Sequence, residues 1–290
     1  MAHPVFIAEI IFMVARNGDD AIRGNKIMKR LNCRGSAIEA CATKAGTIVG
    51  PLMTELVGFK ELTPYRGGWC GNEIFADSFS AEVRQKARDW TFQFGEQLRK
   101  EGYRGYFELD FLIDMDTNEM YLGELNPRVT GASSMTNHAA FAHADAPLAL
   151  FHLLEFSGVD FELDVDALNA RWADPDNIDS WSQFVMKHTD DSVDILVDAP
   201  ESGIYHMNDD GSIEYSRFDY HRRAVATENE AFFLRISGKD LGILVTRGRL
   251  MNNNFKLNKR AKMWINGMRN KFIGRSLTPA PISDGSFKIL

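Results

Sequence analysis

The sequence is short of the features that mark secreted, membrane-spanning and nucleic-acid-binding proteins. Its 290 residues include only three cysteines, and none of them forms the CxxC spacing of redox or zinc sites. This usage predicts reduced thiols that take no part in the chemistry, and a cytoplasmic protein. No apolar run approaches the roughly 18 residues that a membrane-spanning helix requires. With 33 Lys and Arg against 40 Asp and Glu, the chain also lacks the basic excess of nucleic-acid binders.

The rest of the composition is that of a globular protein. Hydrophobic residues make up 44% and charged residues 25%, which excludes a disordered chain and a collagen-like repeat. A chain of this length can hold one large domain or two modest ones. Near the N-terminus, Ile7, Ile10, Ile11 and Val14 fall at helical spacing and predict a short helix.

The apolar patterns further along predict an α+β fold. Glycine-punctuated apolar stretches between residues 26 and 51 predict two or three strands, followed by a loop over 63–72. Ser80 is expected to cap a helix that ends at Gly102, and 105–113 and 120–125 are expected to form a β-hairpin. Beyond a short helix at 147–156, strands are expected around 204–207, 212–215, 231–236 and 241–246, and a helix over 257–272.

The expected hairpin carries the most informative polar residues. Side chains alternate along a strand, so Glu108 and Asp110 share one face, and Glu124 and Asn126 share a face of the next strand. If the two faces coincide, three carboxylates and an amide converge, and a divalent cation would relieve their repulsion. Oxygen ligands without His or Cys favour Mg²⁺ or Mn²⁺. The alternative is a solvated hairpin face, in which Asn-Pro is only a turn.

Arg128 adds a cation two residues beyond Asn126. Its planar guanidinium could bind carboxylate or phosphoryl oxygens in a bidentate manner. The small residues from Thr130 to Ser134 offer backbone N–H groups near the start of the next expected helix. Such groups could bind an anionic part of a substrate.

These residues resemble the ATP-grasp superfamily. The resemblance lies in GYFELDFL at 105–112, YLGELNPR at 121–128 and the Thr-Gly pair at 130–131. It implies the C-terminal lobe of an ATP-grasp fold, an antiparallel sheet with flanking helices, followed by a β-rich domain. It also implies ATP and two Mg²⁺ ions, with Asp110 and Glu124 as metal ligands, Asn126 at the second metal, and Arg128 as the catalytic residue. Glu108 could replace Asp110.

The upstream segment is similar to the biotin-carboxylase-like branch of the superfamily. This similarity places Lys29 and Leu31 at the adenine hinge, Glu39 at an inward strand position of the nucleotide site, and 67–73 near the phosphates or the acceptor. In the family, a lobe with a Gly-rich loop and a phosphate-binding lysine comes before this region. Only about 25 residues precede it here. The resemblance therefore implies a truncated or split enzyme, working as a homo-oligomer or with a partner chain that supplies the lobe.

Together these observations predict five segments. They are a short N-terminal helix or remnant at 1–25, a nucleotide- and metal-binding domain at 26–158, an acid-rich linker at 159–180, a β-rich domain at 181–275 and a tail at 276–290.

The function that the resemblance implies is an ATP- and Mg-dependent ligase. Such an enzyme activates a small-molecule carboxylate as an acyl phosphate, which an amine or another nucleophile then attacks. Two alternatives remain, namely activation of bicarbonate as in biotin carboxylase, and a non-catalytic, truncated subunit. Neither nucleic acid nor a membrane is expected as a partner.

Overall fold

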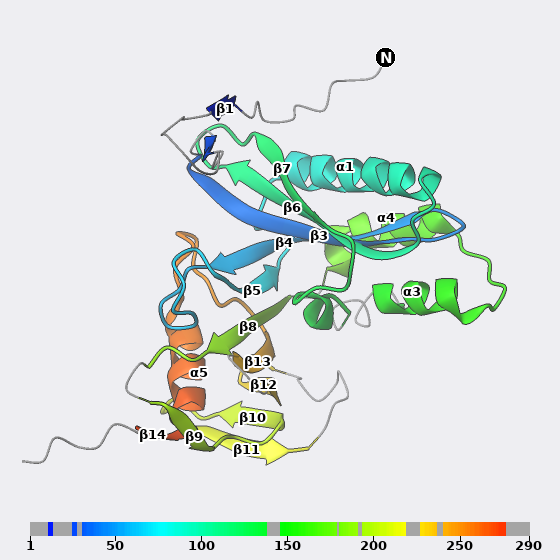
Figure 1. Ribbon diagram of the computed structural model, residues 1–290. Coiled ribbons are helices and arrows are strands. Elements are labelled where there is room, and N and C mark those ends of the chain that lie inside the picture. Colours follow the sequence, from blue (N-terminus) through cyan, green and yellow to red (C-terminus); the bar gives the residue numbers. More distant parts are fainter. Residues whose placement is uncertain are drawn as a thin grey trace, which may run out of the picture. The chain divides into compact units, whose positions relative to one another are not determined.

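The computed structural model describes residues 11–13, 25–27, 31–137, 146–178, 180–190, 193–218, 227–236 and 240–276. The chain divides into two compact units (Figure 1). Unit 1 comprises residues 1–55 and 74–179, and unit 2 comprises residues 56–73 and 180–290. Both units combine strands and helices, as the α+β expectation requires. Within the described residues, no helix is long and apolar enough to cross a membrane.

Unit 1 is built on four antiparallel strands in the order β4, β3, β6, β7. Their bounds are Thr47–Val57, Cys33–Ala42, Gly105–Asp114 and Met120–Asn126. Strand β3 pairs with both β4 and β6, and β7 pairs with β6. This pairing confirms the predicted hairpin. The sequence could predict it because an alternating apolar pattern flanks a polar turn.

The prediction of a short N-terminal helix is wrong for the residues of that segment that the structure describes. Ile11–Met13 forms strand β1, which pairs antiparallel with β2 at Asn25–Ile27. Its branched and aromatic residues suit a strand as well as a helix, so an apolar run this short cannot separate the two by periodicity.

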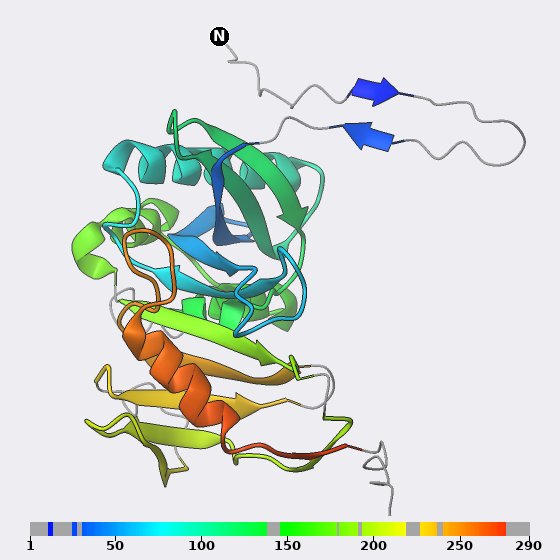
Figure 2. The ribbon, with the colours of Figure 1, turned by 90° about the vertical axis from the view of Figure 1, so that its left-hand side faces the viewer.

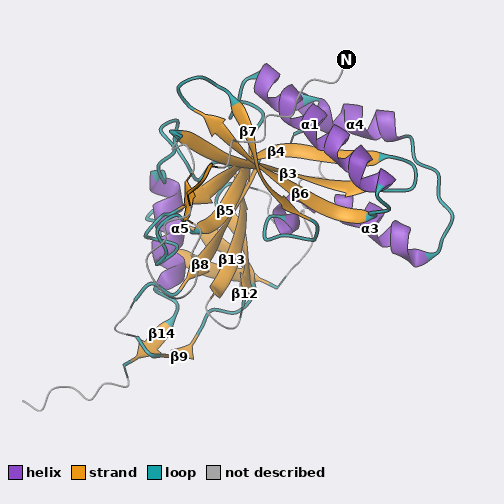
Figure 3. Cartoon of the chain, turned by 45° about the horizontal axis from the view of Figure 1, so that its top comes forward, coloured by secondary structure: helices purple, strands orange, loops and turns teal. Residues whose placement is uncertain are grey.

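Helices cover both faces of this sheet (Figure 3). On one face lies α1, Ala81–Lys100, which begins after Ser80 as predicted, with the Ser80 side chain accepting from the Val83 N–H at 3.3 Å. Its Val83 and Ala87 pack in a cluster with Phe107. The other face packs against α3, Leu148–Ser157, and α4, Val165–Ala173.

The segment 159–180 differs from the linker that its acidic composition predicts. It contains α4 and a 3₁₀ turn at Pro175–Asn177, and its residues up to 179 belong to unit 1. Trp172 is buried beside Cys41 and Ile48. The Asn169 amide accepts from the Val49 N–H at 2.8 Å and donates to the Thr47 carbonyl at 2.9 Å. The segment is thus fastened to β4 through a buried aromatic ring and a side-chain amide.

Unit 2 is a sheet with one helix across it (Figure 2). Its strands follow the order β11, β10, β12, β13, β8, β5. Their bounds are Ile213–Arg217, Gly203–Met207, Glu230–Arg235, Asp240–Arg247, Trp181–Lys187 and Trp69–Ile74. Helix α5, Lys259–Arg269, buries Trp264 and Ile265 in the core. A separate pair joins β9, Ile195–Asp198, to β14, Ile273–Arg275.

The four strands and the final helix expected in this region are confirmed within a few residues, whereas β5 lies where the glycines at 67, 68 and 71 predicted a loop.

The three cysteines are free thiols. Cys33 is exposed, whereas Cys41 and Cys70 are buried. Burial raises the pKa of the Cys70 thiol to about 11 and that of Cys41 still further. The two buried thiols therefore stay protonated and act as small apolar residues.

Candidate functional site

Five acidic side chains from four strands make up what we call the carboxylate cluster of unit 1. Glu39 and Cys41 lie on the same face of β3, and Cys41 packs with α3 and α4. On β6, Tyr106 packs on that same face, and Glu108 and Asp110 share the face because side chains alternate along a strand. The cluster therefore lies on the face opposite α1. Its members are Glu39, Glu55, Glu108, Asp110 and Glu124.

The pairing register brings these side chains together. Glu39 lies directly opposite Glu108 across β3 and β6. Asp110 lies opposite Glu124 across β6 and β7, and Glu108 lies opposite Asn126. The two hairpin faces thus coincide, which is the condition that the metal-site prediction requires. That these groups bind a metal stays a prediction.

The edge of the cluster at β7 is a short chain of hydrogen bonds. Arg128 Nη2 donates to Asn126 Oδ1 at 2.9 Å, and Asn126 Nδ2 donates to Asp110 Oδ2 at 3.1 Å. The second oxygen of Asp110 is buried and has no hydrogen-bond partner among the described residues. Glu124 and Arg128 are exposed. This edge therefore combines an orphaned carboxylate oxygen with groups that a ligand can reach from solvent.

Three carboxyl groups of the cluster, those of Glu55, Glu108 and Asp110, hold their protons more tightly than free carboxyls. Burial, followed by Glu39 and Asp110, raises the pKa of Glu108 to about 9. Burial, Asp110 and Glu124 raise the pKa of Glu55 to about 7. Burial and Glu124 raise the pKa of Asp110 to about 6. Clustered acids without a cation behave in this way, because proximity and desolvation both disfavour the charged form.

Glu39 lies opposite Glu108 and is fully buried. Tyr106 Oη donates to its Oε2 at 2.7 Å. Its Oε1 accepts from Thr130 Oγ1 at 2.7 Å and from Ser133 Oγ at 2.5 Å. Burial and Glu39 raise the pKa of the Tyr106 phenol well above its usual value, so Tyr106 remains a donor. Both oxygens of Glu39 are thus engaged within the protein, whereas the resemblance placed Glu39 against the nucleotide.

Thr130 lies between two of the acids. Its Oγ1 is 2.7 Å from Glu39 Oε1 and 2.9 Å from Glu108 Oε2. A hydroxyl has one hydrogen to donate, so the second short contact requires a proton on a carboxyl group. Glu108, with its raised pKa, is the group that carries this proton at neutral pH. Glu108 then donates to Thr130, and Thr130 donates to Glu39.

Sequence reasoning missed Glu55, and it singled out 130–134 for backbone N–H groups and not for the Thr130 and Ser133 hydroxyls that contact Glu39. Glu55 belongs to it because β4 continues to Val57, beyond the residues that were expected to form a strand. Its side chain lies over Gly35, where an added Cβ would come within 2.2 Å of Glu55 Oε2. The signal that could have found Glu55 is its two-residue spacing from Met53 on a longer strand. The hydroxyls could be found only from the contacts that the turn after β7 makes with Glu39.

The expected nucleotide residues upstream receive little support. Lys29 lies outside the described residues, and Leu31 is half-buried just before β3. The stretch 67–73, expected near the phosphates, supplies β5 of unit 2. There the buried Glu73 Oε1 accepts from the backbone N–H groups of Leu250 and Met251. Glu73 therefore anchors a chain segment.

Among the described residues, no group of three or more His, Cys, Asp or Glu side chains is placed to hold a metal ion. Mg²⁺ in nucleotide sites is usually held by one or two carboxylates, with water and phosphates completing its shell. Asp110, Glu124 and Asn126 fit that smaller donor set.

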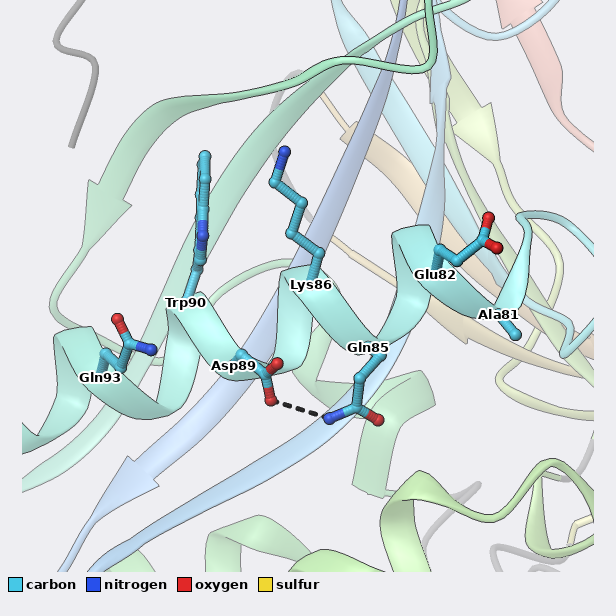
Figure 4. A pocket seen from close by; sticks show the side chains of 7 residues that line it. All are labelled: Ala81, Glu82, Gln85, Lys86, Asp89, Trp90 and Gln93. Carbon is cyan, nitrogen blue, oxygen red and sulfur yellow. Dashed lines mark hydrogen bonds between the residues drawn. The ribbon is translucent and has the colours of Figure 1, made fainter. Parts of the chain in front are cut away.

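A hollow of about 510 Å³ lies on the exposed side of α1 (Figure 4). Its lining comes from this one helix, where Gln85 Nε2 donates to Asp89 Oδ1 at 2.7 Å and the Lys86 ammonium lies 5.0 Å from the Trp90 ring centre. Because no second element encloses it, the hollow is a solvated helix face. It takes no part in the carboxylate cluster, which lies on the other side of the sheet.

Comparison with known proteins gives likenesses in fold. No family model and no curated protein matches the sequence. Among solved structures, a pyruvate carboxylase from Rhizobium etli is 14% identical, with a TM-score of 0.49, over 91% of this chain and 23% of that one. A biotin carboxylase from Campylobacter jejuni is 12% identical, with a TM-score of 0.48, over 87% of this chain and 49% of that one.

A third solved structure is N5-carboxyaminoimidazole synthase from Aspergillus clavatus, in complex with ADP and its ribonucleotide. It is 11% identical, with a TM-score of 0.42, over 77% of this chain and 48% of that one. The chain thus spans about half the length of the biotin carboxylase and of the synthase, and less than a quarter of the pyruvate carboxylase.

Proposed function

We propose that unit 1 binds Mg-ATP at the carboxylate cluster and takes part in activating a carboxylate as an acyl phosphate, for attack by an amine or another nucleophile. The observation that carries this proposal is the register of β6 and β7. It sets Asp110 opposite Glu124, and hydrogen bonds connect Asp110 through Asn126 to Arg128.

The residues present fit a divalent cation. All donors are oxygens, Asp110 Oδ1 is buried without a partner, and the crowded acids have raised pKa values. Asp110 and Glu124 would hold one Mg²⁺ ion, and Asn126 would contribute to a second. When bound, the metal offsets the negative charge of the phosphates and of the acids around them.

Arg128 is the residue we assign to the reacting anion. It is exposed, and its hydrogen bond to Asn126 fixes one end of the guanidinium beside the metal ligands. A guanidinium presents five N–H donors in a planar fork, so the rest of the fork can reach carboxylate or phosphoryl oxygens. A fixed cation at that point stabilises negative charge that develops during transfer.

Turnover by the whole enzyme is a further part of the proposal. For turnover, a partner chain or a second copy of this chain completes the nucleotide site. The carboxylate is a small molecule, and bicarbonate is one candidate, because a solved neighbour is a biotin carboxylase domain with bound bicarbonate. Comparing ADP production with and without bicarbonate separates this substrate from other carboxylates.

The first test is calorimetric titration with Mg-ATP. Wild-type protein is expected to bind, and Glu124→Ala is expected to lose affinity by at least about tenfold, because a metal ligand is gone. The matched control is Glu119→Ala, which removes an exposed acid from the turn of the same hairpin. Phosphate release that depends on Mg-ATP should fall in Glu124→Ala and persist in Glu119→Ala.

Two results would contradict the proposal. One is full phosphate release by Glu124→Ala. The other is no detectable heat from wild-type protein at millimolar nucleotide, which would support the non-catalytic subunit instead.

A further inference from the structure

The hydroxyl groups that donate to Glu39 come from two parts of unit 1. Tyr106 belongs to β6, whereas Thr130 and Ser133 belong to the segment that follows β7. Two acids directly opposite each other on a sheet, as Glu39 and Glu108 are, normally destabilise the pairing. A fully buried carboxyl group is also costly unless hydrogen bonds satisfy it. A feature this unfavourable for packing calls for a role besides packing.

The Thr130 and Ser133 hydroxyls also accept hydrogen bonds within the turn at residues 130–133, to which both belong. Ser133 Oγ accepts from the Thr130 N–H at 2.9 Å, and Thr130 Oγ1 accepts from the Ala132 N–H at 3.2 Å. Each hydroxyl therefore accepts within the turn and donates to Glu39. Because Glu39 takes up both donated hydrogens, it fixes the direction of both hydroxyls and with them the backbone of residues 130–133.

This turn begins two residues after Arg128. The Arg128 N–H donates to the Asn126 carbonyl at 2.8 Å, so the backbone from Asn126 to the turn is constrained at both ends. Further on, Asn137 Nδ2 donates to the Ser133 carbonyl at 2.6 Å, and Asn137 Oδ1 accepts from the Ala149 N–H of α3 at 2.9 Å. The segment after β7 is thus fastened to β3, to β6 and to α3.

We propose that Glu39 is a positioning residue, which holds the 130–133 turn through Thr130 and Ser133 and thereby sets the place of Arg128 and Asn126 beside Asp110. The inference rests on the proposed function, because it assigns Arg128 and Asn126 to the reacting site. Glu39 itself touches no ligand, since it is fully buried and both of its oxygens are engaged.

The test compares Thr130→Val with Thr130→Ser. Valine keeps the shape of threonine and removes the hydroxyl, whereas serine keeps the hydroxyl and removes a methyl group. The control is Thr136→Val, which makes the same change six residues later. The Thr136 hydroxyl contacts the Met53 sulfur and the Ala132 carbonyl and does not contact Glu39. Ser133→Ala and Glu39→Gln provide milder changes to the network, so that one unstable variant does not decide the outcome.

The first readout is hydrogen–deuterium exchange of the amides at Thr130 and Ala132, which requires no nucleotide. The second is kcat for Mg-ATP-dependent phosphate release, set against the Kd for Mg-ATP from calorimetry. Thr130→Val is expected to exchange faster at both amides and to lose kcat by about tenfold or more, since small displacements of a catalytic group are costly. Its Kd for Mg-ATP should stay within about threefold of wild type, and Thr130→Ser should recover kcat.

Unchanged exchange in Thr130→Val and Glu39→Gln would overturn the positioning role. So would a lower melting temperature with an unchanged kcat, which is what a purely structural role produces. An equal loss of kcat in Thr136→Val would also overturn it. If wild-type protein fails to bind Mg-ATP, the proposed function falls. The exchange readout distinguishes that failure from a failure of Glu39 to hold the turn.

Discussion

At Glu108, burial and three neighbouring acids raise the pKa to about 9, whereas the same side chain in an unfolded chain titrates near 4.5. Between these two values the folded state holds a proton that the unfolded state has lost. The free energy of unfolding therefore falls as the pH rises from about 4.5 to about 9. Glu55 and Asp110 act in the same direction up to about pH 7 and about pH 6.

Glu108→Gln should remove the contribution of Glu108 to this pH dependence, because an amide does not titrate and its NH₂ can donate to the Thr130 hydroxyl, which lies 2.9 Å from Glu108 Oε2. Relative to wild type, the variant should gain at least about 1 kcal/mol of unfolding free energy between pH 5 and pH 8, since one pKa unit corresponds to about 1.4 kcal/mol. Urea denaturation at several pH values measures the gain. Glu119→Gln, a change at an exposed acid, serves as the control. Parallel curves for wild type and Glu108→Gln would show that Glu108 titrates normally.

Residue order alone identifies only part of the site. Glu124, Asn126 and Arg128 could be singled out because a strand and the residues just after it bring together groups that are close in sequence. Glu55, Thr130 and Ser133 join the cluster through the β3–β4 and β3–β6 registers and the turn after β7. A single sequence does not encode those pairings in any local pattern.

Among the elements of unit 1, α1 is fastened to its neighbours by a buried cation. Arg88 donates to the carbonyl oxygens of Gly50 at 2.6 Å and of Asn169 at 2.8 Å, and also to those of Val49 and Trp172. It thereby connects α1 to β4 and α4. Burial lowers the pKa of the Arg88 guanidinium to about 10, so it remains charged at neutral pH.

Arg88→Leu is expected to lower the free energy of unfolding by about 3 kcal/mol, because four buried carbonyl groups lose a charged donor. Chemical denaturation measures the change. Lys86→Gln, an exposed substitution on the same helix, should stay within about 0.5 kcal/mol of wild type. A loss in Arg88→Leu no larger than that of the control would mean that water replaces the guanidinium at these carbonyls.

Elements with strong local signals could be predicted, whereas others depend on contacts distant in sequence. Helix α1 has a capping serine and a periodic apolar stripe, and it was located to within a few residues. Strand β5 was missed because the glycines at 67, 68 and 71 suggest a loop, although Asn72 and Glu73 are buried in the structure. Helix α4 was missed because its surroundings are acidic, and its attachment through Asn169 and Trp172 is made to β4 and β3.

For the molecule as a whole, no single boundary in the sequence separates the two units, because the chain passes from unit 1 to unit 2 and back before it enters unit 2 again. The expectation of separate domains at 26–158 and 181–275 treats each as continuous. In the structure, residues 56–73 belong to unit 2, although they are flanked by unit 1 on both sides. Leu56, Leu62 and Cys70 lie in the unit 2 core with Trp264 and other apolar residues.

Residues 180–276 produced alone should therefore fail to fold cooperatively. Without 56–73, the core loses Leu62, the Lys187 N–H loses its bond to the Leu62 carbonyl, and β8 loses its neighbour β5. Attaching 56–73 through a flexible linker should restore a cooperative thermal transition, measured by near-ultraviolet circular dichroism. The same linked protein carrying Leu62→Asp should show no cooperative transition, because the substitution buries an unpaired charge. A cooperative transition in 180–276 alone would mean that unit 2 holds its core without this segment.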